Sequence, residues 1–186
     1  MAGVQREVEI KFRVVAAQEV RQKLAALGAH CEGTFHEENY FCDDAQGHLR
    51  AGSRLLRLRR STGTTGALEP LVEQRLTYKE PVPDPRFKVR SEVEITVSDL
   101  DSLRLILEHL GFQCRHGYDK ERETWRLEGV MVTLDTLSFG QFVELEGEPE
   151  AIAGVAAGLG FDFKEGITKS YLTLAAEATK NAIDRR

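Results

Sequence analysis

Glutamates spaced two residues apart are the first feature of this sequence that could do chemistry. Such pairs occur at Glu7 and Glu9 and again at Glu144 and Glu146. On a β-strand, side chains two residues apart share a face and lie roughly 6.6 Å apart, and a neighbouring strand is about 4.8 Å away. Carboxylates from adjacent strands could therefore form an oxygen shell for Mg²⁺ or Mn²⁺. Pairing with nearby arginines is the alternative, and the pattern alone leaves both open.

Lysine and arginine are the second such feature, and they follow a strict alternation. In residues 7–14, charged side chains hold the odd positions and apolar ones the even positions, which indicates a strand with one charged and one apolar face. The same alternation recurs in residues 56–59, 72–79, 86–97 and 120–128. Basic side chains outnumber acidic ones on these polar faces, although the chain carries a net charge of -5. The planar fork of arginine suits phosphate oxygens.

These charged faces have two interpretations. An antiparallel sheet often has one solvated face, which would explain each strand taken alone. Because bases gather on the faces of several strands, we favour a curved sheet that closes with its charged side inward. The predicted fold class is α+β, a closed antiparallel β-barrel that forms a tunnel with a polar interior and has helices packed on the outside. Buried bases would then require a polyanion, because uncompensated buried charge is costly.

Helical patterns fall between the strands. Helices are expected over 18–27, from 98 or 99 to 110, from 149 to about 159 and from 172 to about 182, and hairpin loops over 61–66 and 80–85. Glycine follows the first three helices, as is common at helix ends. We predict a single domain over residues 1–186, with a core over about 5–174 and a C-terminal helix and fraying tail over 175–186.

Composition excludes several classes of protein. Charged residues make up 30% and hydrophobic residues 41% of the chain, which favours a folded domain over disorder. The negative net charge argues against a partner of duplex nucleic acid. No apolar run reaches the roughly 18 residues of a membrane span, and the first residues lack the apolar core of a signal peptide. The 3 cysteines are few, odd in number and widely spaced, which predicts a cytoplasmic protein without a disulfide framework.

A series of motifs along nearly the whole chain resembles the CYTH superfamily, also called triphosphate tunnel metalloenzymes. In family order they are EVEIKF at 7–12, LLRLRR at 55–60, LTYKEP at 76–81, RSEVEI at 90–95, DKERETW at 119–125, VTLDTLSFGQFVELEGE at 132–148 and TKSYLTL at 168–174. The resemblance implies a barrel whose tunnel binds a triphosphate together with Mg²⁺ or Mn²⁺. Members include inorganic tripolyphosphatases, thiamine triphosphatases, RNA triphosphatases and class IV adenylyl cyclases.

Motif position implies a role for each charged residue. The expected metal ligands are Glu7, Glu9, Glu144 and Glu146, and Asp135 beside them is expected to be part of the same metal site. The expected phosphate-binding residues are Lys11, Arg57, Arg59, Lys79, Arg90, Lys120, Arg122 and Lys169. Among all of these, we expect Glu9, Lys79 and Arg122 to be catalytic. Apart from Lys169, these are the positions that the alternation places on the polar faces.

The resemblance implies three candidate functions. The leading prediction is a metal-dependent enzyme that hydrolyses the terminal phosphoryl group of tripolyphosphate or of an organic triphosphate such as thiamine triphosphate or ATP. The first alternative is a class IV adenylyl cyclase, although Gln141 stands where some cyclase-like members have an acidic residue. The second alternative is a non-catalytic module that binds polyphosphate or nucleotide. We expect no membrane partner, and a homodimer is compatible with the chain.

Overall fold

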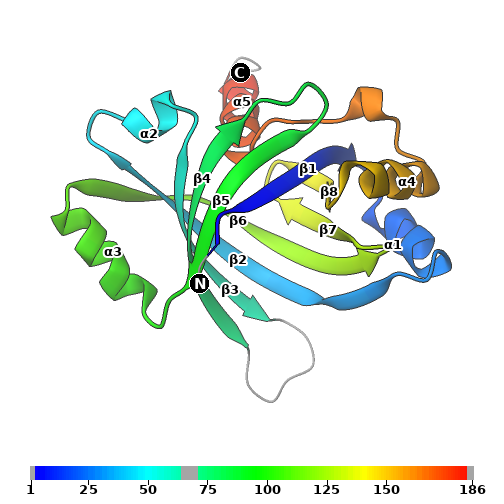
Figure 1. Ribbon diagram of the computed structural model, residues 1–186, viewed down its shortest axis with the longest axis horizontal. Coiled ribbons are helices and arrows are strands. Elements are labelled where there is room, and N and C mark those ends of the chain that lie inside the picture. The colour runs from blue at the N-terminus through cyan, green and yellow to red at the C-terminus, as the bar shows by residue number, and fades with distance from the viewer. Residues whose placement is uncertain (1–2, 64–70, 184–186) are drawn as a thin grey trace.

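A closed antiparallel barrel forms the body of the protein, as the alternation predicts. The computed structural model describes residues 3–63 and 71–183. Around the barrel the strands follow the order β1-β5-β4-β3-β2-β6-β7-β8 (Figure 1). The strands are β1 (Gln5–Val14), β2 (His30–Asp44), β3 (Leu55–Gly63), β4 (Val72–Val82), β5 (Lys88–Thr96), β6 (Phe112–Leu127), β7 (Val130–Leu137) and β8 (Gly140–Glu146).

Helices pack around this barrel, and the fold class is α+β. They are α1 (Ala17–Ala26), α2 (His48–Ala51), α3 (Leu100–His109), α4 (Pro149–Leu159) and α5 (Tyr171–Ile183), with a 3-10 turn over Phe163–Glu165. The four helices expected from sequence are confirmed, whereas α2 and the 3-10 turn were missed because both are too short to show a helical period. α1 and α4 lie side by side on one flank of the barrel, and α3 lies on the opposite flank (Figure 1). Within the described residues, no helix has the length and apolar character needed to cross a membrane.

Local signals explain where these helices begin and end. The carboxylate of Asp99 accepts hydrogen bonds from the backbone N–H groups of Asp101 and Ser102, and so caps the first turn of α3. Gly160 ends α4 with a φ of 81°, a left-handed conformation that glycine adopts without a steric penalty. Both expected loops begin later than the sequence suggests, because β3 continues to Gly63 and β4 to Val82. The rest of the first loop, and the tail over 184–186, lie outside the described residues.

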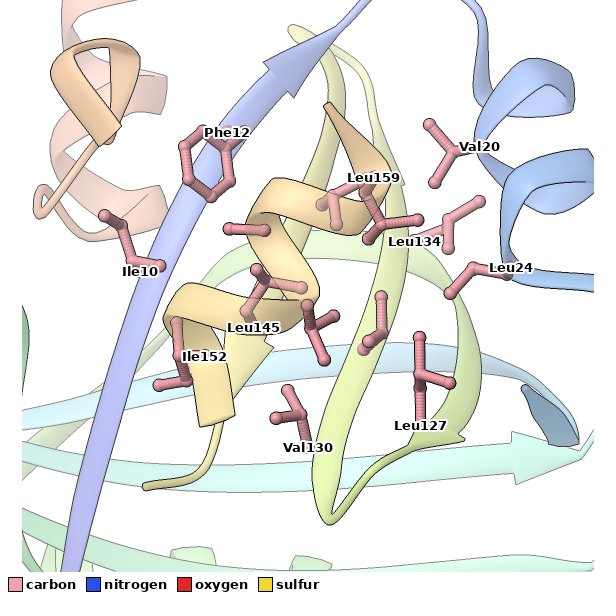
Figure 2. Close-up of a cluster of buried hydrophobic side chains, with 14 of the residues drawn as sticks. Ile10, Phe12, Val20, Leu24, Leu127, Val130, Leu134, Leu145, Ile152 and Leu159 are labelled. Carbon is pink, nitrogen blue, oxygen red and sulfur yellow. The ribbon is translucent and has the colours of Figure 1, made fainter. Parts of the chain in front are cut away.

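The main hydrophobic core lies between the barrel wall and the pair α1 and α4. On β1, Val8, Ile10 and Phe12 are buried and form part of this core. Figure 2 shows side chains from both helices gathered against those of the strands. Burying an aliphatic or aromatic side chain of this size contributes about 1.5–3 kcal/mol. Since the apolar faces of the strands point outward into this core, the charged faces must line the interior.

One expectation from the cysteines is wrong. Cys42 on β2 and Cys114 on β6 form a disulfide, whereas the number and spacing of the cysteines argued against disulfides. The two residues are 72 positions apart in sequence but directly opposite in the β2–β6 register, with Cα atoms 4.0 Å apart. Spacing along the chain could not reveal this proximity, because only the strand pairing creates it. Cys31 is the free cysteine and is exposed.

Candidate functional site

A cavity of about 570 Å³ lies inside the barrel, where the charged faces of the strands meet. The sequence-predicted site residues that line it are Glu7, Glu9, Lys11, Arg57, Arg59, Lys79, Lys120, Arg122, Glu144 and Glu146. They come from β1, β3, β4, β6 and β8, so barrel closure brings together side chains that are far apart in sequence. The structure thus supports an inward charged face over the alternative of a solvated outer surface.

One side of the cavity is rich in cations, and Asp135 on β7 holds them in place. Arg122 donates from Nε to Asp135 Oδ1 at 2.7 Å and from Nη2 to Oδ2 at 2.5 Å, a two-point contact that fixes the guanidinium plane. Lys120 Nζ lies 3.1 Å from the same Oδ2, and the hydroxyl of Tyr171 donates to it at 2.8 Å. Asp135, expected beside the metal ligands, is fully engaged with these donors and orients them.

Glu37 and Asn39 on β2 complete this cationic side, and the sequence analysis missed both. Glu37 is 5% exposed, and its carboxylate lies 3.2 Å from both Arg59 Nη1 and Lys120 Nζ. Arg59 also donates from Nε to Asn39 Oδ1 at 2.9 Å. Although burial opposes ionisation, Arg59 and Lys120 hold the pKa of Glu37 well below its usual range. The alternation of residues 37, 39 and 41 on β2 was the available signal for these inward positions.

Burial and a neighbouring positive charge change the pKa of Lys120. Burial lowers the pKa of Lys120 to about 8, and the neighbouring positive charge of Arg122 adds to this, while Asp135 and Glu37 act in the opposite direction. The ring of Tyr171, contributed by α5, lies 5.3 Å from Lys120 Nζ and 4.3 Å from Lys11 Nζ. These cation–π contacts place both ammonium groups against one end of the cavity.

The other side of the cavity is rich in carboxylates. Glu7 accepts from Lys79 at 2.6 Å, and Glu9 accepts from Lys88 at 2.6 Å. Lys11 links the two sides, because its Nζ lies 2.5 Å from Glu144 and 3.6 Å from Glu9. Glu144 also contacts Arg122, so it takes part in the cationic side as well.

Glu146 stands out on the carboxylate side because it makes no ion pair with any described residue. It lies directly opposite Glu9 in the β1–β8 register. Burial raises the pKa of its carboxyl group to about 7, and the charges of Glu7 and Glu9 add to this. Glu7 Oε2 is buried and has no hydrogen-bond partner. This excess of negative charge is what a bound cation would relieve.

The donor set fits a hard divalent cation in its chemistry. Glu7, Glu9 and Glu146 offer only carboxylate oxygens, which Mg²⁺ and Mn²⁺ prefer, and one of these oxygens lacks a partner. Within the described residues, no three carboxylate, imidazole or thiol groups already converge as a metal cage. Lys79 and Lys88 instead hold two of the carboxylates.

Two predicted phosphate-binding residues do not line the cavity. Arg90 on β5 donates to the backbone oxygen of Ser53 at 2.7 Å and faces a second cavity. Lys169, which precedes α5, lies 2.6 Å from Glu177, and its side chain is 55% exposed. Residues outside the predicted site set also line the first cavity: Arg75, Lys88, Glu92, Glu94, Tyr118 and Tyr171.

The sequence that supplies these side chains matches a known protein family. The family model described as CYTH domain matches residues 5–164. The chain belongs to the CYTH family. The family is generally metal-dependent, and a relative of this chain carries the name of a putative adenylate cyclase.

Individual relatives give the scale of the similarity. A Methanocaldococcus jannaschii protein named "putative adenylate cyclase" is 30% identical over 142 residues, which are 75% of either chain. The PH1819 protein of Pyrococcus horikoshii is 27% identical, with a TM-score of 0.78 over 92% of this CYTH chain and 98% of its own. A Hippeastrum protein, titled a "putative adenylyl cyclase" that reveals a dominant triphosphatase activity, shares the fold at 24% identity, with a TM-score of 0.59 over 82% of this chain and 85% of its own.

Proposed function

We propose that this CYTH protein is a metal-dependent triphosphatase that hydrolyses the terminal phosphoryl group of a small-molecule triphosphate. The observation that carries the proposal is the convergence of cations in the first cavity, opposite a side with excess carboxylate. The cations are Lys11, Arg57, Arg59, Lys79, Lys120 and Arg122. A linear triphosphate of about four negative charges is the size and charge of ligand that such a lining would neutralise.

The cationic side chains would bind and orient the phosphate chain. Arg57 and Arg59 alternate on β3, so both guanidinium groups point inward and can grip successive phosphates. Arg122, fixed by Asp135, would neutralise the charge that develops on the leaving oxygen. Because Asp135 holds Arg122 in place before substrate arrives, little reorganisation is needed during the reaction.

On the carboxylate side, Glu7, Glu9 and Glu146 would hold the divalent cation, with Glu144 turned toward Lys11 and Arg122. When bound, such a cation supplies Lewis-acid charge neutralisation at phosphate oxygens. Lys79 and Lys88 pair with Glu7 and Glu9, and they would be available to the phosphates if these carboxylates held a cation instead. The set Glu9, Lys79 and Arg122 therefore remains our proposed catalytic set.

A class IV adenylyl cyclase is the second candidate function. The supporting observation is the 30% identical relative from Methanocaldococcus jannaschii and its cyclase name. A cyclase would use the same cations to hold ATP but direct the ribose hydroxyl to the α-phosphorus, which releases pyrophosphate.

A cytoplasmic location and a homodimer remain predictions from the sequence.

A metal-dependent substrate panel tests the proposal. Purified protein is incubated with tripolyphosphate, thiamine triphosphate or ATP, with Mg²⁺ or Mn²⁺, and orthophosphate, pyrophosphate and cyclic AMP are separated. Orthophosphate release supports the triphosphatase, whereas cyclic AMP with pyrophosphate supports the cyclase. Tight binding without any product would overturn both and favour a non-catalytic module.

Substitution of the carboxylates tests the metal ligands. Glu9→Gln and Glu146→Gln should each lower metal-dependent turnover by about a hundredfold or more, because each removes a charge from the cation site. Glu146 makes no ion pair with any described residue, so its substitution breaks none in the fold. Glu121→Gln is the matched control, because Glu121 pairs with His36 on the exposed outer face. Near-normal turnover of both site variants would remove the metal assignment.

A further inference from the structure

A second cavity, of about 760 Å³, adjoins the first at one end of the barrel. Four residues line both cavities and so lie between them: Phe41, Leu55, Ser170 and Leu172. The second cavity is bounded by α2, by the adjoining ends of β2, β3 and β6, by Arg90 of β5 and by the first turns of α5.

Four arginines line the second cavity: Arg50, Arg54, Arg90 and Arg115. Their hydrogen-bond partners differ from those in the first cavity. Arg54 donates to the backbone oxygen of His48 at 3.2 Å, and Arg115 donates to Gln113 Oε1 at 2.8 Å. Within the described residues, none of the four arginines makes an ion pair with a carboxylate, whereas Arg57, Arg59 and Arg122 of the first cavity all do.

The two carboxylates that line the second cavity serve another purpose. Asp43 accepts hydrogen bonds from the backbone N–H groups of Leu49 and Arg50, at 2.9 and 3.0 Å. Asp44 accepts from the backbone N–H of His48 at 3.1 Å and lies 2.7 Å from Nδ1 of the same residue. Both carboxylates therefore hold the turn of α2 and leave the guanidinium groups without a charged partner. A guanidinium group has five N–H donors, so each arginine retains donors for a ligand.

We propose that the second cavity is a separate binding site for a phosphoryl oxyanion. Guanidinium groups with free donors and no carboxylate partner match phosphate oxygens, and apolar side chains such as Leu49 and Leu56 also line the cavity. The anion has two sources with the same chemistry: free orthophosphate, or a further phosphate joined covalently to the molecule held in the first cavity. The inference concerns binding alone and does not require that the protein hydrolyses anything.

Calorimetric titration without divalent metal tests this site with three probes: orthophosphate, tripolyphosphate and a longer linear polyphosphate. The test variant is Arg50→Gln combined with Arg115→Gln, since neither residue is part of the first cavity. If free phosphate is the ligand, the variant loses about tenfold or more of the orthophosphate affinity. If the phosphate belongs to the same molecule, the variant loses a similar factor for the longer chain while tripolyphosphate affinity stays within twofold.

A matched control separates local contacts from the general loss of positive charge. Arg60→Gln combined with Arg104→Gln removes two charges from arginines that already pair with carboxylates. The proposal is overturned if the test variant binds all three probes as the wild type does, or if it weakens all three by the same factor as the control. Either result is independent of the substrate panel, because no turnover is measured.

Discussion

The two sides of the barrel interior differ in which charge is in excess. On the side built from β2, β3, β6 and β7, burial and Arg122 lower the pKa of Lys120 to about 8. On the side built from β1, β5 and β8, burial and neighbouring carboxylates raise the pKa of Glu146 to about 7. One side thus requires an anion and the other a cation. A metal–triphosphate complex, the ligand that we propose for this barrel, carries both charges in one molecule.

Removing Arg122 breaks the cationic side and has the largest expected effect. Arg122→Gln leaves the buried carboxylate of Asp135 with fewer positive partners and should lower the free energy of unfolding by about 3–5 kcal/mol, measured by urea unfolding. Triphosphate binding should be lost in the same variant. Arg126→Gln on the same strand is the control, because its pair with Glu32 is half exposed and is worth less than about 1 kcal/mol. Equal stability of the two variants would contradict a buried Arg122 ion pair.

Removing the charge of Glu146 should stabilise the folded protein, by less than the loss of Arg122 destabilises it. The folded pKa of about 7 lies above the ordinary value of 4.5, so the folded protein binds the proton more tightly than the unfolded chain. The contribution of this group to stability is therefore complete below pH 4.5 and declines as pH rises to about 7. In chelator at about pH 8, Glu146→Gln should be more stable than wild type by about 1–3 kcal/mol.

Thermal unfolding at several pH values between about 4 and 8 measures this difference. Mg²⁺ should stabilise the wild type more than Glu146→Gln, because the variant has lost a negative charge beside Glu7 and Glu9. A variant whose stability follows the wild-type pH curve would show that burial and the neighbouring carboxylates do not raise the pKa of Glu146.

Proton uptake at Lys120 is a smaller effect that tests the cationic side, and calorimetry measures it. Near pH 8 the Lys120 side chain is neutral in about half of the molecules, and a bound polyanion favours its charged form. Triphosphate binding at about pH 8 should therefore take up about half a proton at Lys120, seen as a dependence of the binding enthalpy on the ionisation enthalpy of the buffer. Lys120→Gln should lose this part of the uptake. Identical uptake in both proteins would place the titrating group elsewhere.

Lys169 should give the smallest effect. Its side chain is half exposed and is bound to Glu177, outside the first cavity. Lys169→Gln should change tripolyphosphate affinity by less than about threefold, because screened surface charges contribute little. A loss of tenfold or more would show that the segment before α5 moves inward when substrate binds.

Alternation explains why most of the candidate site could be predicted from sequence. On β1 and β3 the side-chain period of two fixes which residues share a face, so the pattern alone assigns Glu7, Lys11 and Arg57 correctly to the cavity. Glu37 was missed because the alternation on β2 was not followed. The TKSYLTL motif includes Tyr171, but the alternation could not place its side chain at the site, because a helix that docks on a barrel follows no strand period.

The sequence by itself determined which residues share a face on most of the strands and which charges those faces carry, since these depend on local backbone geometry. Only the tertiary structure decided which charges meet. Strand register places Glu146 opposite Glu9 and brings Cys42 to Cys114, and the pairing of β2 with both β3 and β6 brings Arg59 and Lys120 to a shared Glu37. These contacts join residues far apart in the chain, and their geometry follows from packing and hydrogen bonding over the whole sheet.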